Sequence, residues 1–491
     1  MTTVDVSGWA KRNLWRTNSN AVAVRAGFRQ LKAPDSGRKY VGGFSVKNDR
    51  AEETWHYVFD VKTTGAKDLR LHVMDGAFNV FQTMNLGADV DPRAITHAQV
   101  FNHLVIASPD IPTLWGQIGV GMTYADSVAS DSGSDVVEIP RGICSSWNNR
   151  IVICDGRIMY VSDPVALGGG DVRSFIGENA NQRPGIIYGV HEGAHGMIVV
   201  VTSSGVFGLD SAAAAVGVVG SNGSNWRILS HNPATSHASS CVVRGRVFGM
   251  TQNGFALIDT ENDSEQNLSE LDVSRAYGPR IFDPDWRDVR MFAGDYGPLV
   301  GHSDQSAIFA FDVMTGFGSW WTSDYAPILR GTLRDTDGDQ LLLCENGVYR
   351  LTGDFDGDIL LSSGLSVQPK GGFVGALQAI PSKNRDVKDV FAAAATGGAG
   401  EIAIALRGSA HATTPIVDPE GFVIGTDSWT TDKRATSTPM ADVRIKFGSE
   451  DAQPTREPSL EIMVDGCLTR IVDVLDVIDA SGAETRPSKV G

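Results

Sequence analysis

The chain of 491 residues is too long for one ordinary hydrophobic core, so we expect a large repeat-built body and at least one further domain. Its 55 glycines and 42% hydrophobic residues favour many short strands joined by tight turns over long helices. The formal net charge of -16 argues against tight wrapping of nucleic acid, because such binding depends on Lys and Arg placed on phosphates.

The N-terminal segment is basic although the chain is acidic. Residues 1–39 contain eight Lys or Arg residues against Asp5 and Asp35, a balance of about +6, which leaves about -22 for the remainder. Two interpretations stay open: a solvated terminus, or a docking arm for an acidic partner surface. We assign residues 1–45 to an N-terminal arm or a ring-closing strand.

Neither a secretory signal nor a membrane-spanning segment is visible. Residues 1–10 lack the apolar core of a signal peptide, and no apolar run approaches the roughly 20 residues that cross a bilayer. We therefore expect a soluble protein made in the cytosol. The five cysteines form no CxxC pair and are predicted to be small buried hydrophobes; the positions are Cys144, Cys154, Cys241, Cys344 and Cys467.

A hairpin pattern recurs along the chain. Residues 151–163 read IVICDGRIMYVSD, in which two β-rich runs flank Asp155-Gly156, a pair suited to a type I′ turn. The same pattern returns at 198–210, 247–259 and 341–352, and weaker copies with longer and more varied turns occur at 57–75, 103–115 and 298–312. The turns are spaced by about 43 to 50 residues, the range of a four-stranded propeller blade.

Such units are expected to close into a ring, because one blade cannot bury its apolar face alone and an open stack would leave exposed edges. We predict a mainly β protein with a β-propeller of about seven blades over residues 46–359. Tryptophans between the hairpins should pack between blades; they are Trp147, Trp226, Trp286, Trp320 and Trp321. Longer strand-like runs after residue 359 predict a C-terminal β-sandwich-like domain over 360–491.

The sequence HEGAH at residues 191–195 matches the HExxH pattern of zinc proteases. That chemistry needs both histidines on one helical turn, whereas the flanking runs IIYGV and MIVVV favour strands. We expect a hairpin loop and no zinc there.

Two DxDGD stretches, at 335–339 and 354–358, could suggest calcium. The spacing departs from the EF-hand pattern, so Asp-Gly turns between strands explain them better. Residues 221–226 only partly match an Asp-box, and Walker, Rossmann and GxSxG motifs are missing from the sequence. We therefore assign no catalytic, cofactor-binding or metal residue and expect no cofactor and no enzyme.

Several segments, taken in order, resemble one family. Residues 21–28 (AVAVRAGF) resemble a strand leading into Arg-Pro-Gly-aromatic, with Ala26 in place of the proline. Residues 157–164 (RIMYVSDP) look like a strand that ends in Ser-Asp-Pro. Further segments follow at 225–255, 267–269 and 311–320. Together they are similar to the propeller-containing tail hub or nozzle proteins of short-tailed bacteriophages, also called packaged-DNA stabilisation proteins.

The resemblance implies a structural virion protein of the phage tail, synthesised in the host cytoplasm. Copies would form a homo-oligomer, expected to be a hexamer, below the portal and adaptor proteins. Tail fibre or needle proteins would be further partners. Double-stranded DNA would pass transiently through the ring, which would help to retain and eject the genome.

Two other functions stay open. A propeller hydrolase or lyase acting on a polysaccharide would need convergent carboxylates, about 5 to 10 Å apart, at one mouth of the ring. A WD-like adaptor protein would instead use the faces of a single propeller to hold other proteins.

Overall fold

The computed structural model contains β-strands and short 3-10 turns in its described regions. Its described residues are 2–3, 10–16, 22–48, 52–65, 68–87, 90–124, 127–129, 136–162, 164, 175–179, 185–209, 226–268, 289–302, 306–323, 328–352, 358–361, 366–367, 370–376, 387–395, 400–407, 429–430, 434–436, 441–446, 459–465 and 470–479. Within them, no helix has the length and hydropathy of a membrane-crossing segment.

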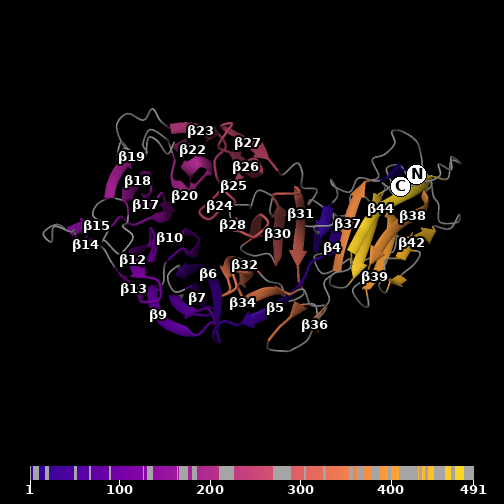
Figure 1. Cartoon of the computed structure of the whole chain (residues 1–491), viewed down its shortest axis with the longest axis horizontal. Coiled ribbons are helices and arrows are strands. Elements are labelled where there is room, and N and C mark those ends of the chain that lie inside the picture. Colours follow the sequence, from indigo (N-terminus) through magenta and orange to yellow (C-terminus); the bar gives the residue numbers. More distant parts are fainter. Residues whose placement is uncertain are drawn as a thin grey trace.

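Seven sheets lie around a common centre, so the chain is a seven-bladed β-propeller (Figure 1). Blade 1 consists of β6 (Arg38–Asn48), β7 (Glu53–Lys62), β8 (Leu69–Asp75) and β9 (Val80–Gly87), and blade 2 consists of β10 (Thr96–Val100), β11 (His103–Ser108), β12 (Ile111–Gln117) and β13 (Gly121–Tyr124). Blade 3 consists of β16 (Ile143–Trp147), β17 (Arg150–Asp155), β18 (Ile158–Ser162) and β19 (Phe175–Asn179), and blade 4 consists of β20 (Ile187–Glu192), β21 (Ile198–Thr202), β22 (Gly205–Leu209) and β23 (Trp226–Ser230). Blade 5 consists of β24 (Ser240–Val243), β25 (Arg246–Thr251), β26 (Gly254–Asp259) and β27 (Ser264–Asn267). Blade 6 consists of β28 (Val289–Ala293), β29 (Pro298–His302), β30 (Ala307–Asp312) and β31 (Phe317–Thr322). Blade 7 consists of β32 (Leu329–Arg334), β33 (Gln340–Cys344), β34 (Gly347–Thr352) and β5 (Gly27–Lys32).

All seven predicted hairpins are present, each as the second and third strands of a blade. The sequence predicted these hairpins because each joins two strands that are consecutive in the chain through one turn. One turn differs in detail. Asp155 pairs with Ile158, so the two-residue loop is Gly156-Arg157, and among residues 155–158 a positive φ occurs only at Gly156 (58°). This fits a type II′ turn rather than the predicted type I′ turn.

The N-terminal part of the chain closes the ring. Strand β5 pairs antiparallel with β34, with Phe28 opposite Leu351, and supplies the outer strand of blade 7. The last blade therefore combines strands from both ends of the propeller sequence. The first blade begins at Arg38, so the predicted boundary between residues 45 and 46 falls inside β6.

Seven apolar clusters among the described residues fill the seven contacts between neighbouring blades. The contact that shuts the ring joins Leu333, Leu343 and Val348 of blade 7 to Tyr40 and Val58 of blade 1, all of them buried. Because each blade buries both faces against its neighbours, ring closure removes every described face from water except those at the rim and the two ends.

The described tryptophans named above lie between blades, as predicted. Trp147 and Trp226 pack between blades 3 and 4, Trp320 between blades 5 and 6, and Trp321 between blades 6 and 7. The Nε1 atom of Trp147 also donates a hydrogen bond of 2.6 Å to the carbonyl oxygen of Gly196. Trp286 lies outside the described residues.

Strands from both termini continue beyond the propeller. Strand β2 pairs with β31 at the edge of blade 6, and β35 pairs with β5 at the edge of blade 7. The other strands outside the blades are β1 (Thr2–Thr3), β2 (Ala10–Arg12), β3 (Leu14–Arg16), β4 (Val22–Val24), β14 (Ser127–Ala129), β15 (Val136–Glu138), β35 (Asp358–Ile359), β36 (Ser366–Val367), β37 (Lys370–Ala376), β38 (Val387–Ala395), β39 (Gly400–Arg407), β40 (Trp429–Thr430), β41 (Arg434–Thr436), β42 (Ala441–Lys446), β43 (Ser459–Asp465) and β44 (Arg470–Asp479). The side chains of residues 362–491 lie outside the description, so the sandwich-like packing stays a prediction.

Candidate functional site: a groove at the propeller rim

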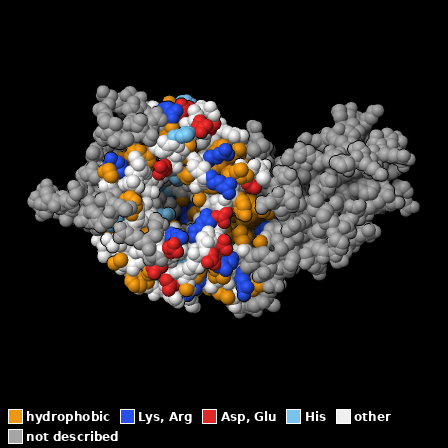
Figure 2. Space-filling view, viewed as in Figure 1, with side chains coloured by type: hydrophobic (Ala, Val, Ile, Leu, Met, Phe, Trp, Pro, Cys, Tyr) orange, Lys and Arg blue, Asp and Glu red, His pale blue; other side chains and the backbone are white. Residues whose placement is uncertain are grey.

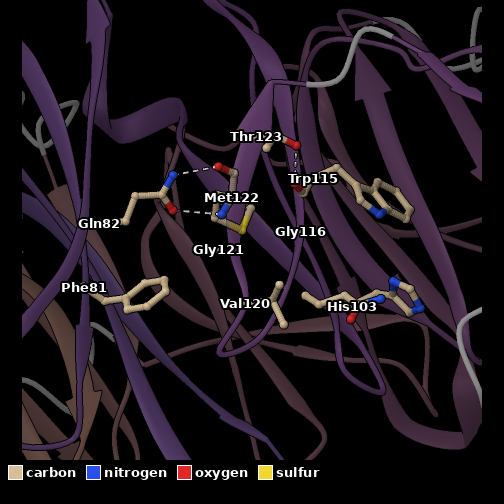
Figure 3. Close-up of a pocket in the computed structure, with 10 residues that line it drawn as sticks. Phe81, Gln82, His103, Trp115, Gly116, Val120, Gly121, Met122 and Thr123 are labelled. Carbon is tan, nitrogen blue, oxygen red and sulfur yellow. Dashed lines mark hydrogen bonds between the residues drawn. The ribbon is translucent and has the colours of Figure 1, made fainter.

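A groove opens at the rim between the outer strands of blades 1 and 2, with a volume of about 530 Å³. Figure 3 shows Phe81 and Gln82 of β9 on one side and Trp115 and His103 on the other, with Val120 between them. The lining residues are Phe81, Gln82, His103, Trp115, Gly116, Gln117, Val120, Gly121, Met122 and Thr123. We call this surface the rim groove.

The Gln82 side chain fixes the geometry of the rim groove. Its Nε2 atom donates to the carbonyl oxygen of Met122, and its Oε1 atom accepts from the Met122 N–H, both at 2.9 Å (Figure 3). The amide thereby satisfies the two backbone groups of Met122 as a neighbouring strand would. A second contact runs from the Tyr124 hydroxyl to the Asn85 carbonyl oxygen at 2.8 Å. These bonds hold the two outer strands at a set distance.

Large apolar side chains stand exposed around the rim groove. The exposed fractions are 51% for Val80, 57% for Phe81, 71% for Val120 and 46% for Tyr124. The Phe81 ring also contacts Trp55 edge-on, with ring centres 5.5 Å apart. Clustered exposed apolar residues are unusual on the surface of a protein that acts alone and often mark an interaction site.

The chemistry of the rim groove suits binding rather than catalysis. His103 is its one ionisable lining residue, and it is buried. Polysaccharide cleavage normally needs two carboxylates beside the scissile bond, and the lining contains none. Aromatic and Met side chains without charges are instead typical of the core of a protein interface.

Figure 2 shows a hollow in the propeller face with side chains of both charges around it, and a set of interacting charged groups includes the segment between blades 1 and 2. The 3-10 turn η1 (Pro92–Ala94) lies between blades 1 and 2, and Asp91 at its start accepts a bond from the Arg93 N–H at 2.9 Å. Burial opposes ionisation of Asp91, but the Arg93 hydrogen bonds and the charge of Arg290 hold its pKa below the usual value. Burial lowers the pKa of His237, while the charge of Asp91 opposes this shift.

These electrostatic influences connect parts of the ring that are not neighbours, because Asp91 precedes blade 2, His237 precedes blade 5 and Arg290 belongs to blade 6. The turn η1 therefore lies within electrostatic reach of blade 6 and of the segment that precedes blade 5. Asp91 is paired with Arg93 at 3.0 Å, and Asp110 accepts from the Asp91 N–H at 3.0 Å. The carboxylates of Asp91 and Asp110 thus hold the turn in place. They do not form the open pair of acids that a glycosidase uses.

A group of possible metal ligands in blade 1 serves the fold instead. Asp35, Asp60 and His72 bring ligand atoms within 4.8 Å of one another. Two guanidinium groups occupy the carboxylates: Arg38 Nε lies 2.8 Å from Asp60, and Arg70 Nη2 lies 3.1 Å from Asp35. Burial raises the pKa of Asp60, but hydrogen bonds from His72, Arg70 and Arg38 outweigh it and lower this pKa to about 2. The network ties β6, β7 and β8 together and offers little room for a cation.

The HEGAH sequence at residues 191–195 spans the end of β20 and the 3-10 turn η3 (Ala194–Gly196), as the hairpin-loop prediction required. His191 is hydrogen-bonded to Ser240 Oγ at 2.7 Å, and burial lowers its pKa to about 4. His195 has a positive φ of 57° and contacts Glu261 at 3.4 Å. The two histidines therefore face different partners rather than one metal.

The first DxDGD stretch is a turn between β32 and β33. Asp335 Oδ1 accepts from the N–H groups of Asp337 and Asp339 at 2.9 and 2.8 Å, which satisfies the turn without a cation. In the second stretch, residues 354–357 lie outside the description, while Asp358 is buried and paired with Arg25 at 2.7 Å. The aspartates of the described parts act in the fold.

Three of the eight basic residues of the N-terminal segment form ion pairs within the chain. Arg25 pairs with Asp358, Arg38 with Asp60, and Lys39 with Glu345 at 2.9 Å. Neither of the two open interpretations, a solvated terminus or a docking arm, included these internal pairs. Sequence reasoning also missed the rim groove. Its one local signal was Val80-Phe81, an apolar pair at the start of a strand.

Comparisons with known proteins found no family for the chain and only remote structural neighbours. No family model matches the chain, and no curated protein sequence matches it. Among solved structures, a streptogramin B lyase is similar at 12% identity and a TM-score of 0.41 over 66% of this chain and 97% of that one. The C-terminal WD40 domain of Sif2 is similar at 10% identity and a TM-score of 0.37, over 70% and 95%. The extracellular domain of BT4673 from B. thetaiotaomicron matches at 11% identity and a TM-score of 0.43, over 91% and 62%. The chain is a seven-bladed β-propeller with distant structural neighbours of diverse kinds.

Proposed function

We propose that the chain is a structural protein of a short-tailed phage tail, a hub or nozzle subunit. Copies form a ring, a hexamer, that extends the DNA channel below the portal and adaptor proteins. The ring helps to retain and eject the genome and offers attachment points for tail fibre or needle proteins. Its location is the virion, after synthesis in the host cytoplasm.

The rim groove is the observation that carries a structural role over a catalytic one. The groove is lined mainly by apolar and aromatic side chains, and its one ionisable lining residue is His103. A subunit that assembles with other proteins needs such a surface, whereas a hydrolase needs exposed acid and base groups. The phage assignment itself depends on the resemblance of residues 21–28, 157–164, 225–255, 267–269 and 311–320 to tail hub and nozzle proteins.

The internal use of charge also favours a scaffold. Buried or half-buried ion pairs join segments far apart in the sequence, such as Arg25 with Asp358 and Lys39 with Glu345. Pairs that connect distant segments restrict relative movement, and a tail component has to withstand internal DNA pressure. The basic residues in these pairs bind carboxylates of the same subunit, so they do not contact the phosphates of DNA.

Co-sedimentation with purified portal and adaptor rings tests the proposal. In a density gradient, the chain should move with the portal–adaptor complex and not with portal alone. A monomeric WD-like adaptor or an enzyme should stay at the top of the gradient in every mixture. That outcome, with correctly folded chain confirmed by circular dichroism, would contradict the tail assignment.

A further inference from the structure

We propose that the N-terminal segment is a strap that makes closure of the propeller and attachment of the C-terminal strands one cooperative event. The strap consists of the described parts of residues 2–32, which form the strands β1 to β5. While the strap is in place, blade 7 is complete and the C-terminal strands are held at blade 6. When the strap is released, both contacts open together. The inference goes beyond the proposed function and does not depend on the phage assignment.

Strand β2 joins blade 6 to the C-terminal strands within one sheet. It pairs in parallel with β31, the outer strand of blade 6, where Arg12 lies opposite Trp320. On its other side it pairs antiparallel with β37, where Lys11 lies opposite Phe373. The sheet continues from β37 to β43 and β39. Because β31 and β37 both pair with β2 and not with each other, the sheet divides at this point if β2 leaves.

Other strands of the strap belong to the second sheet of the C-terminal part. Strands β1 and β4 both pair with β44, with Thr2 opposite Val477 and Val22 opposite Ile471, and β3 pairs with β4. Figure 1 shows the indigo β4 next to β37. The next strand, β5, returns to the propeller as the outer strand of blade 7. The strap therefore alternates between the two parts, so its displacement affects both.

Asn13 marks the point where the strap turns away from blade 6. It is 3% exposed and has a φ of 51°, a conformation that Asn adopts more readily than most residues. Its N–H donates to the Trp320 carbonyl oxygen at 2.6 Å, and its own carbonyl oxygen accepts from the Arg25 N–H at 2.8 Å. Its Oδ1 atom accepts from Arg25 Nε at 3.0 Å. Asn13 thus connects the edge of blade 6 to the residue that pairs with Asp358.

Buried polar contacts continue from Arg25 to the closing strand β5 and its neighbours. Arg25 is paired with Asp358 of β35, the strand that follows the last blade. Gln30 of β5 is 5% exposed; its Nε2 atom donates to the Asn346 carbonyl oxygen at 2.8 Å, and its Oε1 atom accepts from the Leu361 N–H at 3.1 Å. Removing one partner from such contacts leaves a buried polar group unsatisfied, which is costly. The contacts are therefore expected to form and break together.

An aromatic cluster adds an apolar connection between the early strap and β5. The Trp15 ring of β3 lies 5.3 Å from Trp321 of blade 6 and 5.4 Å from Tyr296. The Trp321 ring in turn lies 6.4 Å from Phe28 of β5, and both are buried in the cluster between blades 6 and 7. Displacing Trp15 uncovers the apolar contact that also holds β5, so the two ends of the strap share one core.

Native-state hydrogen exchange of the unmodified full chain tests this cooperativity. With increasing denaturant, β5, β34, β37 and β43 should begin to exchange together, with one common opening free energy. Strand β43 is the most informative, because it pairs with β37 and β39 and not with the strap. Strand β11 of blade 2 should stay protected at least as long. If the opening constants of β43 and β5 differ by more than about tenfold, the two events are separate and the proposal is wrong.

A matched pair of variants gives a second test. Asn13→Val and Asn149→Val each place a β-branched residue at a positive φ, 51° and 57°, which such residues disfavour. Asn149 is exposed in the turn between β16 and β17 of blade 3. We expect Asn13→Val to speed exchange in β5, β37 and β43 by about tenfold or more, whereas Asn149→Val should affect only blade 3.

A faster exchange in Asn13→Val that is confined to β2, β31 and β37, with β5 and β43 unchanged, would overturn the coupling. The measurement on the wild type decides the question if Asn13→Val prevents folding.

Discussion

Arg25 and Asp358 form a buried, two-pronged ion pair that fastens the ring-closing strand to the segment after the last blade. The Nη2–Oδ2 and Nη1–Oδ1 distances are 2.7 and 2.8 Å, and the side chains are 1% and 2% exposed. Asp358 also accepts from the Phe28 N–H at 2.8 Å, and the Arg25 guanidinium stacks on the Phe28 ring at 3.8 Å. The pair therefore locks β5 where it completes blade 7.

Breaking this pair should destabilise the propeller strongly. Arg25→Met or Asp358→Asn leaves one charged group buried without its partner, which costs about 3 to 5 kcal/mol. Chemical denaturation should show a lower midpoint, together with faster proteolysis near residue 26. Arg334→Ala, which breaks an exposed pair with Asp295, should change stability by about 1 kcal/mol or less. Equal denaturation midpoints for the Arg25 and Arg334 variants would show that the Arg25–Asp358 ion pair does not stabilise the propeller.

His56 should make the stability depend on pH between about 4 and 6.5. Burial lowers its pKa from 6.5 to about 4, although Asp75 and Asp335 are nearby. The unfolded chain binds a proton in this window and the folded chain does not, so stability is full above pH 6.5 and falls as the pH drops towards 4. The loss from this group is on the order of 3 kcal/mol at most.

The variant His56→Gln can still hydrogen-bond Ser45 but does not titrate. Its denaturation midpoint should therefore fall less between pH 7 and pH 4.5 than that of the wild type. Part of the pH dependence should persist, because burial also lowers the pKa of His191 to about 4. Identical slopes for variant and wild type would show that His56 is not a buried neutral group.

Four of the five cysteines should be unreactive in the native chain. Cys144, Cys154, Cys241 and Cys344 are buried free thiols, and burial raises the pKa of Cys144 to about 12 and shifts the others in the same direction. A colorimetric thiol assay should detect at most one fast thiol before unfolding, Cys467, which lies outside the described side chains, and all five in denaturant. Two or more fast native thiols would be inconsistent with the buried positions.

The two histidines of HEGAH should behave differently from zinc ligands. His191→Ala removes the bond to Ser240 and should cost about 1 to 2 kcal/mol of stability. His195→Ala alters an exposed side chain and should leave stability nearly unchanged. Adding zinc or a chelator should not move the melting temperature of the wild type. A zinc-dependent rise that both variants abolish would overturn this assignment.

The blades were predictable because their information is local. A strand, a Gly-centred turn such as Gly156-Arg157 and a second strand are contiguous in the sequence, so each hairpin could be recognised alone. The spacing of these hairpins then predicted the number of blades, since one blade occupies about 45 residues. The deeply buried Trp147 followed from the same reasoning.

The contacts between distant segments were not predictable in this way. Asp358 belongs to a stretch first considered for calcium, and nothing in the sequence pairs it with Arg25, 333 residues away. The rim groove depends on Gln82 of one blade meeting the backbone of Met122 in the next, a relationship set by the propeller geometry. The residues that line the rim groove can be identified only once the arrangement of the blades is known.

Electron microscopy of the purified full chain, imaged end-on, tests the central claim most directly. The account predicts a closed ring of copies in which each subunit contains one seven-bladed disc. Class averages that contain only single, unassociated discs at micromolar concentration, with portal and adaptor rings present, would contradict it.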